Sequence, residues 1–193
     1  MPSSPSSAAP SKAVPSKALG AVEPRLTRLS AEEALAALPD LAGILLDCID
    51  GGASVGFMAG FSQAEAEAYW REVAAGVDAG AIVLLGVEWA GHLVGTVQLG
   101  LKQPPNQPHR ADLKKLLVHR SARGAGLARR LLAAAEARAR DAGKSLLVLD
   151  TATGSPAETL YEKLGWRKSG VVPNYALWPD GRFCDTTIFY KAL

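Results

Sequence analysis

The sequence predicts an α+β domain built on one mixed β-sheet, and two patterns lead to this fold class. First, apolar and polar residues alternate with a period of two over several short segments, which is typical of strands with one buried face. Second, segments with helical spacing of apolar residues separate these strands. One strand, 145–150, is instead a continuous apolar run that ends at Asp150, which is typical of a parallel strand. The predicted order is β α α β β β α β α β β, without a visible repeat.

Local start and stop signals set the boundaries of these elements. Ser30, with Glu33 three residues later, forms a capping box that begins the first helix, and Pro39 predicts a kink or a split within it. Gly91 marks a hairpin turn, and Ser155 caps the last helix. The predicted elements are a strand over 25–29, helices over 31–49 and 62–79, strands over 81–90, 92–102 and 111–118, a helix over 124–142, a strand over 145–150, a helix over 155–164, and strands over 166–172 and 183–190.

Composition bounds the kind of protein. The chain has 193 residues, 48% of them hydrophobic, which suffices for one buried core. A net charge of +2 argues against a nucleic-acid partner held by bulk charge, and no apolar run approaches the roughly 18 residues of a membrane helix, so we expect neither partner. The two cysteines, Cys48 and Cys184, favour a reducing, cytoplasmic location. The histidines show no metal-ligand spacing, so we expect no metal.

Residues 1–24 differ from the rest of the chain. They hold five of the twelve prolines among serine and alanine, and such a stretch buries too little apolar surface to offset its ordering entropy. We therefore predict a disordered tail over 1–24 and a folded domain over 25–193. Lys12 and Lys17 in an acid-poor stretch also leave an organellar transit peptide open.

A basic, glycine-rich turn before the helix over 124–142 is the most informative stretch. Gly124 and Gly126 allow several backbone N–H groups to face one point, the helix dipole adds positive potential, and Arg123 and Arg129 add charge. This pattern predicts a phosphate or pyrophosphate site, although a plain strand-to-helix turn would use the same glycines. A P-loop would need Gly-Lys-Ser/Thr here, and a dinucleotide fold would need a third glycine where Arg129 stands.

Two motifs together resemble the GNAT family of N-acetyltransferases. Arg123-x-x-Gly126-x-Ala128 is similar to the Gln/Arg-x-x-Gly-x-Gly/Ala loop of the family, and 157–166 resembles its Ala-x-x-x-Tyr-Glu-Lys-x-Gly-Phe helix. The resemblance covers about residues 25–193. It implies the GNAT fold, with helices on both faces of the sheet, and acetyl-CoA as co-substrate. The coenzyme-binding residues that it implies are Leu117, Val118, Arg123, Gly124, Ala125, Gly126, Leu127, Ala128 and Ser155.

Some of these positions differ from the family pattern or depend on its geometry. Ser155 stands where many relatives have Asn, and a hydroxyl makes one hydrogen bond fewer. The resemblance implies that the strand before the loop separates from its neighbour. The backbone of Leu117 and Val118 would then pair with the pantetheine arm, and an N–H near Val118 would stabilise the oxyanion.

Acetyl transfer to an amine needs a base for the ammonium proton and an acid for the leaving thiolate. The resemblance implies that Tyr161 lies beside the sulfur as the acid, and an ordinary pKa of about 10 keeps it protonated at neutral pH. A buried core tyrosine is the structural alternative for this residue.

Asp150 and Asp112 are the candidate bases. Asp150 ends a strand, where ligands of α/β sheets bind, and the even spacing from Asp112 to Val118 places both side chains on one face. Some relatives have Glu at the position of Asp112, so the shorter side chain suggests a water relay. Asp150 could instead be a turn or capping residue, and Asp112 a partner of Arg110 or Lys114.

The acceptor remains open between several classes. Three segments, 51–59, 149–151 and 179–182, resemble the tabtoxin-resistance acetyltransferases, which implies a small amino-acid-like, toxin-like or antibiotic-like amine and a role in antibiotic resistance. The alternatives are a protein or peptide N-acetyltransferase and a non-catalytic acyl-CoA-binding module. We expect a monomer or a homodimer. The acceptor side would be built from the loops 51–57, 104–108 and 173–180, with Phe57, Tyr175 and Trp178.

Overall fold

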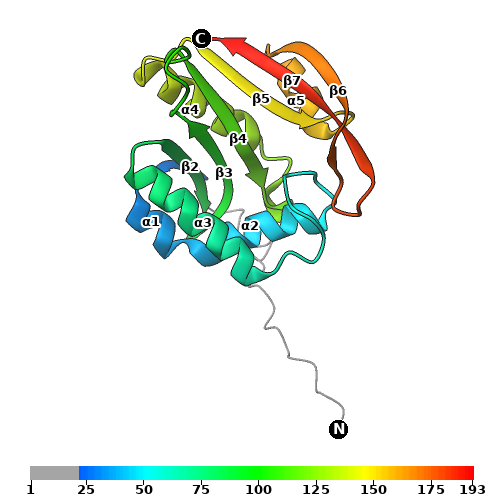
Figure 1. Cartoon of the computed structure of the whole chain (residues 1–193). Coiled ribbons are helices and arrows are strands. Elements are labelled where there is room, and N and C mark those ends of the chain that lie inside the picture. Colours follow the sequence, from blue (N-terminus) through cyan, green and yellow to red (C-terminus); the bar gives the residue numbers. More distant parts are fainter. Residues whose placement is uncertain (1–21) are drawn as a thin grey trace.

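The computed structural model describes residues 22–193, which form one seven-stranded sheet with the order β1-β2-β3-β4-β5-β7-β6 (Figure 1). In this part of the chain, β4 and β5 are parallel and all other neighbouring strands are antiparallel. The predicted α+β class with a single mixed sheet is confirmed. The elements are β1 (Arg25–Leu29), α1 (Ala31–Ala36), α2 (Leu38–Asp50), α3 (Gln63–Asp78), β2 (Ile82–Trp89), β3 (His92–Gly100), β4 (Arg110–Val118), the 3₁₀ turn η2 (Arg120–Ala122), α4 (Leu127–Asp141), β5 (Leu146–Ala152), α5 (Pro156–Lys163), β6 (Arg167–Leu177) and β7 (Phe183–Ala192).

Helix starts follow the capping signals of the sequence. Ser30 accepts a hydrogen bond from the backbone N–H of Glu33 and the carboxylate of Glu33 accepts one from the N–H of Ser30, so the predicted capping box is present. The first predicted helix is split, as Pro39 suggested, but the break lies at Ala37. Pro39 falls in the first turn of α2, where its missing N–H leaves no hydrogen bond unmade.

Helices cover both faces of the sheet but cover them unequally. One core cluster joins α4 and α5 to the inner residues of β2–β5 and β7, and we call this side the α4 face. The other cluster packs α1, α2 and α3 on β2–β4, and we call this side the α2 face. Figure 1 shows these three helices gathered over the first half of the sheet. Among residues 22–193, no helix therefore covers the α2 face of β5, β7 and β6, which can receive a ligand.

A β-bulge in β4 changes which residues face each side. Gln98 of β3 pairs with Lys114, but Thr96 pairs with Leu117, so β4 has one residue more than its partner, and Lys115 has a positive φ of 50°. Leu113 accordingly packs on the α4 face and Leu117 on the α2 face. An unbroken strand would put residues four apart on the same face.

The bulge overturns one argument from the sequence. Even spacing placed Asp112 and Val118 on one face, but Val118 packs on the α4 face, whereas Asp112 lines a hollow on the α2 face. The extra residue at Lys115 is the physical reason. The expectation of a shared face for Asp112 and Val118 is therefore wrong.

β4 and β5 separate soon after they begin. Their pairing spans three steps, from Arg110 with Leu146 to Asp112 with Val148, and then stops although both strands continue. Figure 1 shows β4 and β5 diverging from this point toward their carboxyl ends. From Leu113 and Leu149 onward, the facing backbone edges have no ladder partner in each other. We call this opening the gap.

Other boundaries differ modestly from the predicted ones. α4 begins at Leu127 rather than at Gly124, because the two glycines before it adopt positive φ. β5 continues two residues past Asp150. β6 extends to Leu177, beyond the predicted end at 172, because an irregular register carries the strand past Pro173.

The predicted tail lies mostly outside the described residues, since 1–21 are not described. Just before β1, the indole of Trp89 donates a hydrogen bond to the carbonyl of Val22 (2.6 Å), and Arg130 donates one to that of Pro24 (2.8 Å). None of the helices within 22–193 combines the length and hydropathy needed to cross a bilayer.

Candidate active site

In the described part of the chain, the turn between η2 and α4 has backbone N–H groups without a hydrogen-bond partner. Gly124 and Gly126 have φ of +83° and +73°, and a Cβ at either position would meet no heavy atom within 4 Å. Gly126 is the N-cap of α4, so no side chain caps the first N–H groups of the helix, and its first turn holds no acidic residue. Because these donors need partners and the helix dipole favours negative charge, the turn can bind an anionic phosphate.

Arg123 braces this turn against the end of β4. Its Nε donates a hydrogen bond to the carbonyl of Val118 (3.0 Å), and its Nη2 lies 3.7 Å from the Sγ of Cys48. The residue is exposed, so the remaining N–H groups of the guanidinium are accessible to an anion at the turn.

The gap leads to this turn, because β4 ends at Val118 just before η2. The side chain of Leu117 is buried on the α2 face and that of Val118 packs on the α4 face, so this edge could contact a ligand only through its backbone, of which the carbonyl of Val118 already accepts from Arg123. Unpaired strand edges bind extended amide-containing chains by main-chain hydrogen bonds. An open edge next to an uncapped helix start fits the pantetheine arm and the pyrophosphate of acetyl-CoA.

Three other coenzyme candidates contribute to the same region in different ways. The side chain of Leu127 is buried in the core under α4 and that of Ala128 is half-buried, so their N–H groups are what the helix start can offer. Ser155 caps α5 by accepting a hydrogen bond from the N–H of Glu158 (3.3 Å), and its Oγ lies 3.4 Å from the Oγ1 of Thr151. This structural role explains the serine without a coenzyme contact.

Tyr161 lies on the α4 face of the sheet. Only 5% of the residue is exposed, and its ring packs against those of Trp166 and Phe189, with centroids 5.7 and 5.9 Å away. Burial, and secondly the negative charge of Asp150, raise the pKa of Tyr161 well above its usual value. The phenol therefore keeps its proton at neutral pH, as a proton donor must.

Asp150 lies on the opposite face, close enough to Tyr161 to influence its ionisation. Its neighbour Leu149 is buried in the α4-face cluster, so the side chain of Asp150 points to the uncovered α2 face. Within residues 22–193, no side chain or backbone group hydrogen-bonds to this exposed carboxylate. Asp150 is neither a helix cap nor a turn residue, since β5 continues beyond it.

Asp112 differs because both of its carboxylate oxygens are occupied. Arg110 donates to Oδ1, and Gln103 donates to Oδ2 (3.1 Å). Arg110 also contacts Gln103 and Gln107, so the four side chains form one network. The geometry thus gives Asp112 the structural role of an ion-pair partner.

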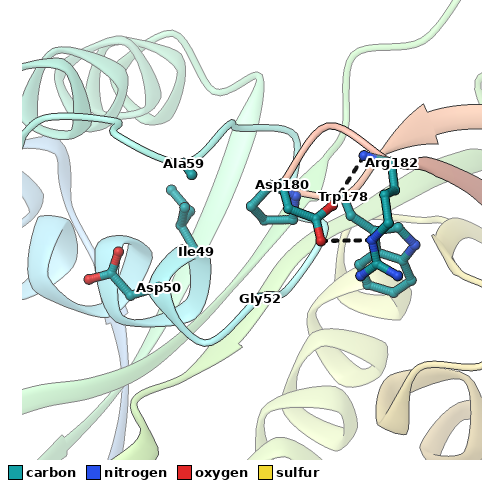
Figure 2. A pocket seen from close by; sticks show the side chains of 8 residues that line it. Ile49, Asp50, Gly52, Ala59, Trp178, Asp180 and Arg182 are labelled. Atoms are coloured by element: carbon teal, nitrogen blue, oxygen red, sulfur yellow. Dashed lines mark hydrogen bonds and ion pairs between the residues drawn. The ribbon is translucent and has the colours of Figure 1, made fainter.

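Two hollows flank the carboxyl-end region of the strands. The first, of about 340 Å³, lies between the end of α2 and the tip of the hairpin formed by β6 and β7. Figure 2 shows Ile49 and Asp50 on one wall and Trp178 with the hydrogen-bonded pair Asp180 and Arg182 on the other. The second, of about 240 Å³, lies on the α2 face between β4 and β6 and holds both Asp112 and Asp150.

The segments predicted for the acceptor side are brought together only in part. The hairpin tip is joined to the loop after α2 by two hydrogen bonds, from Ser54 Oγ to the carbonyl of Leu177 (2.9 Å) and from Ala59 N to that of Pro179 (3.1 Å). Tyr175 lines the second hollow and Trp178 the first. The 104–108 loop lines neither, because it precedes β4 and lies at the end opposite to Val118.

Lys115, at the bulge, is a residue that the sequence reasoning missed. Its Nζ donates to the carbonyl of Val55 (2.7 Å) and lies 5.2 Å from the ring centroid of Phe57 and 5.8 Å from that of Tyr69. Burial lowers its pKa, and the charge of Asp150 opposes that shift. Lys115 thus ties the loop after α2 to β4 beside the candidate base. No residue type in the sequence points to this lysine, because its position depends on the bulge.

Comparison with known proteins bears on the family and the fold of the chain. Residues 55–166, more than half of the chain, match the Acetyltransferase (GNAT) family. The fold is similar to that of ribosomal-protein-alanine N-acetyltransferase from Brucella melitensis, with 23% identity, a TM-score of 0.72, and coverage of 88% of this chain and 99% of that one. It is also similar to an N-acetyltransferase from Staphylococcus aureus Mu50 (21%, TM-score 0.72, 89% and 99%) and to yncA from Salmonella typhimurium, solved with its cofactor acetyl-CoA (19%, TM-score 0.70, 88% and 94%).

Proposed function

We propose that this chain, which belongs to the acetyltransferase (GNAT) family and is an acetyl-CoA-dependent N-acetyltransferase, acetylates the amine of a small amino-acid-like or toxin-like molecule. The observation that carries the proposal is the placement of Tyr161 and Asp150. The phenol of Tyr161 is buried on the α4 face, and the carboxylate of Asp150, at the edge of the gap on the α2 face, is near enough for its charge to raise the pKa of the phenol. An acid and a base on two sides of one opening suit a transfer between a ligand in the gap and a ligand on the α2 face.

The coenzyme side of the site binds and orients. Acetyl-CoA supplies the activated acetyl thioester when bound. The N–H groups of the turn from Arg123 to Ala128 would hold its pyrophosphate, and the free edge of β4 at Leu117 and Val118 would align its arm. Fixing the thioester in this way converts the reaction into one between two positioned groups.

Two side chains then handle the protons. Asp150 would accept a proton from the acceptor ammonium, directly or through one water, because it has no competing partner in the described structure. As the new C–N bond forms and the C–S bond breaks, the Oη of Tyr161 would give its proton to the sulfur. The second proton lost by the acceptor nitrogen, as it becomes the amide, returns through water to the Oη of Tyr161, and Asp150 releases its proton to solvent, so both groups are restored.

The size of the hollows supports a small acceptor. The first, at about 340 Å³, lies near the lower end of the range of roughly 300–1,000 Å³ for small-molecule sites, and the second, at about 240 Å³, lies just below it. The resemblance of the loop after α2 and of the hairpin turn to the tabtoxin-resistance acetyltransferases favours an amino-acid-like amine, and with it a role in antibiotic or toxin resistance. Two separate free cysteines are compatible with the cytoplasm, where we place the reaction.

One relative favours a second candidate. The Brucella melitensis protein is named for acetylating an alanine of a ribosomal protein, so a peptide amine is the alternative acceptor. A thiol-release assay with acetyl-CoA, run against amino-acid-like amines and against short peptides, separates the two. Release with the amines alone is the expected result, and release with the peptides alone would overturn the small-molecule assignment.

The same assay tests whether the protein catalyses at all. Coenzyme A binding without any thiol release above hydrolysis, unchanged by Tyr161→Phe and Asp150→Asn, would indicate an acyl-CoA-binding module. The expected result is release that depends on both residues.

A further inference from the structure

A buried carboxylate at the end of α2 holds the segment that leads into the glycine turn. Asp47 is only 9% exposed, and one of its oxygens, Oδ2, accepts a hydrogen bond from the backbone N–H of Arg120 (2.8 Å). The other, Oδ1, accepts one from the side-chain Nε of Arg120 (2.7 Å) and lies 3.4 Å from Nε2 of His119. One side chain therefore fixes both the main chain and the side chain at the start of η2.

The next residue of α2 extends this contact. The Sγ of Cys48 lies 3.9 Å from the carbonyl of Val118 and 3.7 Å from Nη2 of Arg123. Cys48 thus contacts both ends of the segment from Val118 to Arg123, and Asp47 contacts Arg120 within it. This segment spans the end of β4 and all of η2. Since α2 is packed on the sheet through its own apolar residues, it forms a rigid base for this segment.

The negative charge of Asp47 acts on its neighbour Arg120. Its hydrogen bond and its charge are the two largest causes that raise the pKa of Arg120. A buried carboxylate that accepts a backbone N–H and a guanidinium N–H orients both groups more strongly than a neutral acceptor would. Replacing it with a neutral side chain leaves the backbone N–H of Arg120 with a weaker partner and releases the turn.

We propose that Asp47 is a positioning residue for the coenzyme site: it acts through Arg120 to hold η2, and so sets the direction in which the N–H groups of the glycine turn point. This inference rests on the proposed function, because it takes the glycine turn as the site of the coenzyme pyrophosphate. Asp47 itself does not contact the coenzyme. Its effect lies in coenzyme affinity and leaves the proton transfers at Tyr161 and Asp150 untouched.

The same helix offers a matched control. Asp40, in the first turn of α2, accepts a hydrogen bond from the backbone N–H of Leu93 (2.9 Å) and lies 3.4 Å from Nδ1 of His92. It therefore makes the same kind of contacts to a strand end, with a backbone N–H and a histidine, but far along α2 from the glycine turn. Asp40→Asn and Asp47→Asn remove the same charge from the same helix at opposite ends.

The experiment measures the binding of free coenzyme A to the full chain by calorimetry. We expect Asp47→Asn to raise the Kd about tenfold, since a charged hydrogen bond that fixes the turn is lost, and Asp40→Asn to leave it unchanged. With an active acceptor in hand, Asp47→Asn raises the KM for acetyl-CoA and leaves kcat at saturation nearly unchanged. Amide hydrogen exchange over residues 120–126 becomes faster in Asp47→Asn and not in Asp40→Asn.

The outcomes separate this inference from the proposed function. If the unchanged protein does not bind coenzyme A, both the proposed function and the role of Asp47 are wrong. Binding by the unchanged protein and equal binding by Asp47→Asn would overturn the role of Asp47 alone, as would an equal loss in the two variants, which would indicate a general loss of stability.

A second variant covers the case in which Asp47→Asn does not fold. Arg120→Gln removes the exposed side-chain half of the contact and leaves the Arg120 N–H on Asp47. Its Kd should rise and the rise should persist in about 0.5 M salt, because a positioning effect is not screened. A rise that disappears in salt would show that Arg120 attracts phosphate by charge, and would overturn the positioning role.

Discussion

The two sides of the gap between β4 and β5 are built by different means. On the coenzyme side, one continuous stretch, from Leu117 to Ala128, supplies backbone groups that a helix start and two glycines direct. On the acceptor side, the walls come from α2, the loop after it, β4 and β5, and the hairpin of β6 and β7, which are far apart in the chain. A backbone site depends on chain geometry, whereas the acceptor side depends on individual side chains. Changes on the coenzyme side should weaken coenzyme binding whichever amine is the acceptor. Changes on the acceptor side should alter which amine is acetylated.

The largest expected effect is at Tyr161, which lies between the two sides. Tyr161→Phe removes the proton donor while keeping the ring that packs on Trp166 and Phe189, so kcat should fall by about 10² to 10³-fold with little change in KM. Stopped assays of thiol release measure this. A kcat within a few-fold of the unchanged protein would remove Tyr161 from the chemistry.

The direction of the Tyr161 pKa shift adds a test by pH. Because burial raises the pKa above its unfolded value, the folded state favours the protonated phenol. Its contribution to stability is therefore fully present below pH about 10 and is lost as the pH rises through the folded value. In the unchanged protein, ionisation of Tyr161 should therefore cause no fall in the rate of thiol release below pH about 10. A fall below that pH that is absent from Tyr161→Phe would contradict this.

Next in size is the contrast between the two carboxylates of the second hollow. Asp150→Asn should lower kcat about a hundredfold, because the free base is lost. Asp112→Asn should lower kcat less than about threefold but reduce the free energy of unfolding by about 1–2 kcal/mol, because Arg110 and Gln103 lose a charged partner. Kinetics and urea unfolding on the same samples compare them, and the reverse ranking of the kcat effects would assign the base to Asp112.

A smaller effect is expected on the coenzyme side from Gly126→Asp. A side chain at φ +73° is strained, and a carboxylate there opposes the phosphates, so the Kd of coenzyme A should rise about thirtyfold. Gly143→Asp, at φ +70° just past the other end of α4, carries the same strain and charge and should leave the Kd unchanged. Calorimetry measures both variants, and equal affinities for coenzyme A would contradict the assignment of the glycine turn as the pyrophosphate site.

The smallest effect is expected at Lys115. Lys115→Met keeps the length of the side chain but removes the hydrogen bond to Val55 and the contacts of the ammonium with two rings. The loop after α2 should loosen, and the KM for the acceptor should rise about threefold to tenfold with the KM for acetyl-CoA unchanged. A change in the acetyl-CoA value alone would show that this loop belongs to the coenzyme side.

The same contrast explains how far the sequence could predict the structure. The coenzyme side was accessible because glycines and a helix start are signals carried by adjacent residues, as Gly124 and Gly126 show. The fold followed for a similar reason, since capping boxes and periodicity are local. The role of the coenzyme-side residues in binding acetyl-CoA stays a prediction.

Features that depend on distant pairing were not accessible. The bulge at Lys115 arises from the register between β3 and β4, and a lysine at positive φ carries no residue-type signal. The sequence offered Arg110 as a partner of Asp112, and this ion pair is confirmed, but nothing in the sequence indicated that Gln103 would occupy the other carboxylate oxygen. The first hollow exists because the hairpin tip meets the loop after α2, more than a hundred residues earlier in the chain.

A crystal structure of the full chain with acetyl-CoA tests the central claim most directly. The account predicts the pyrophosphate on the N–H groups of residues 123–128, the arm along the free edge of β4, and the thioester in the gap between Asp150 and Tyr161. A coenzyme bound elsewhere, with the glycine turn and the gap empty, would contradict it.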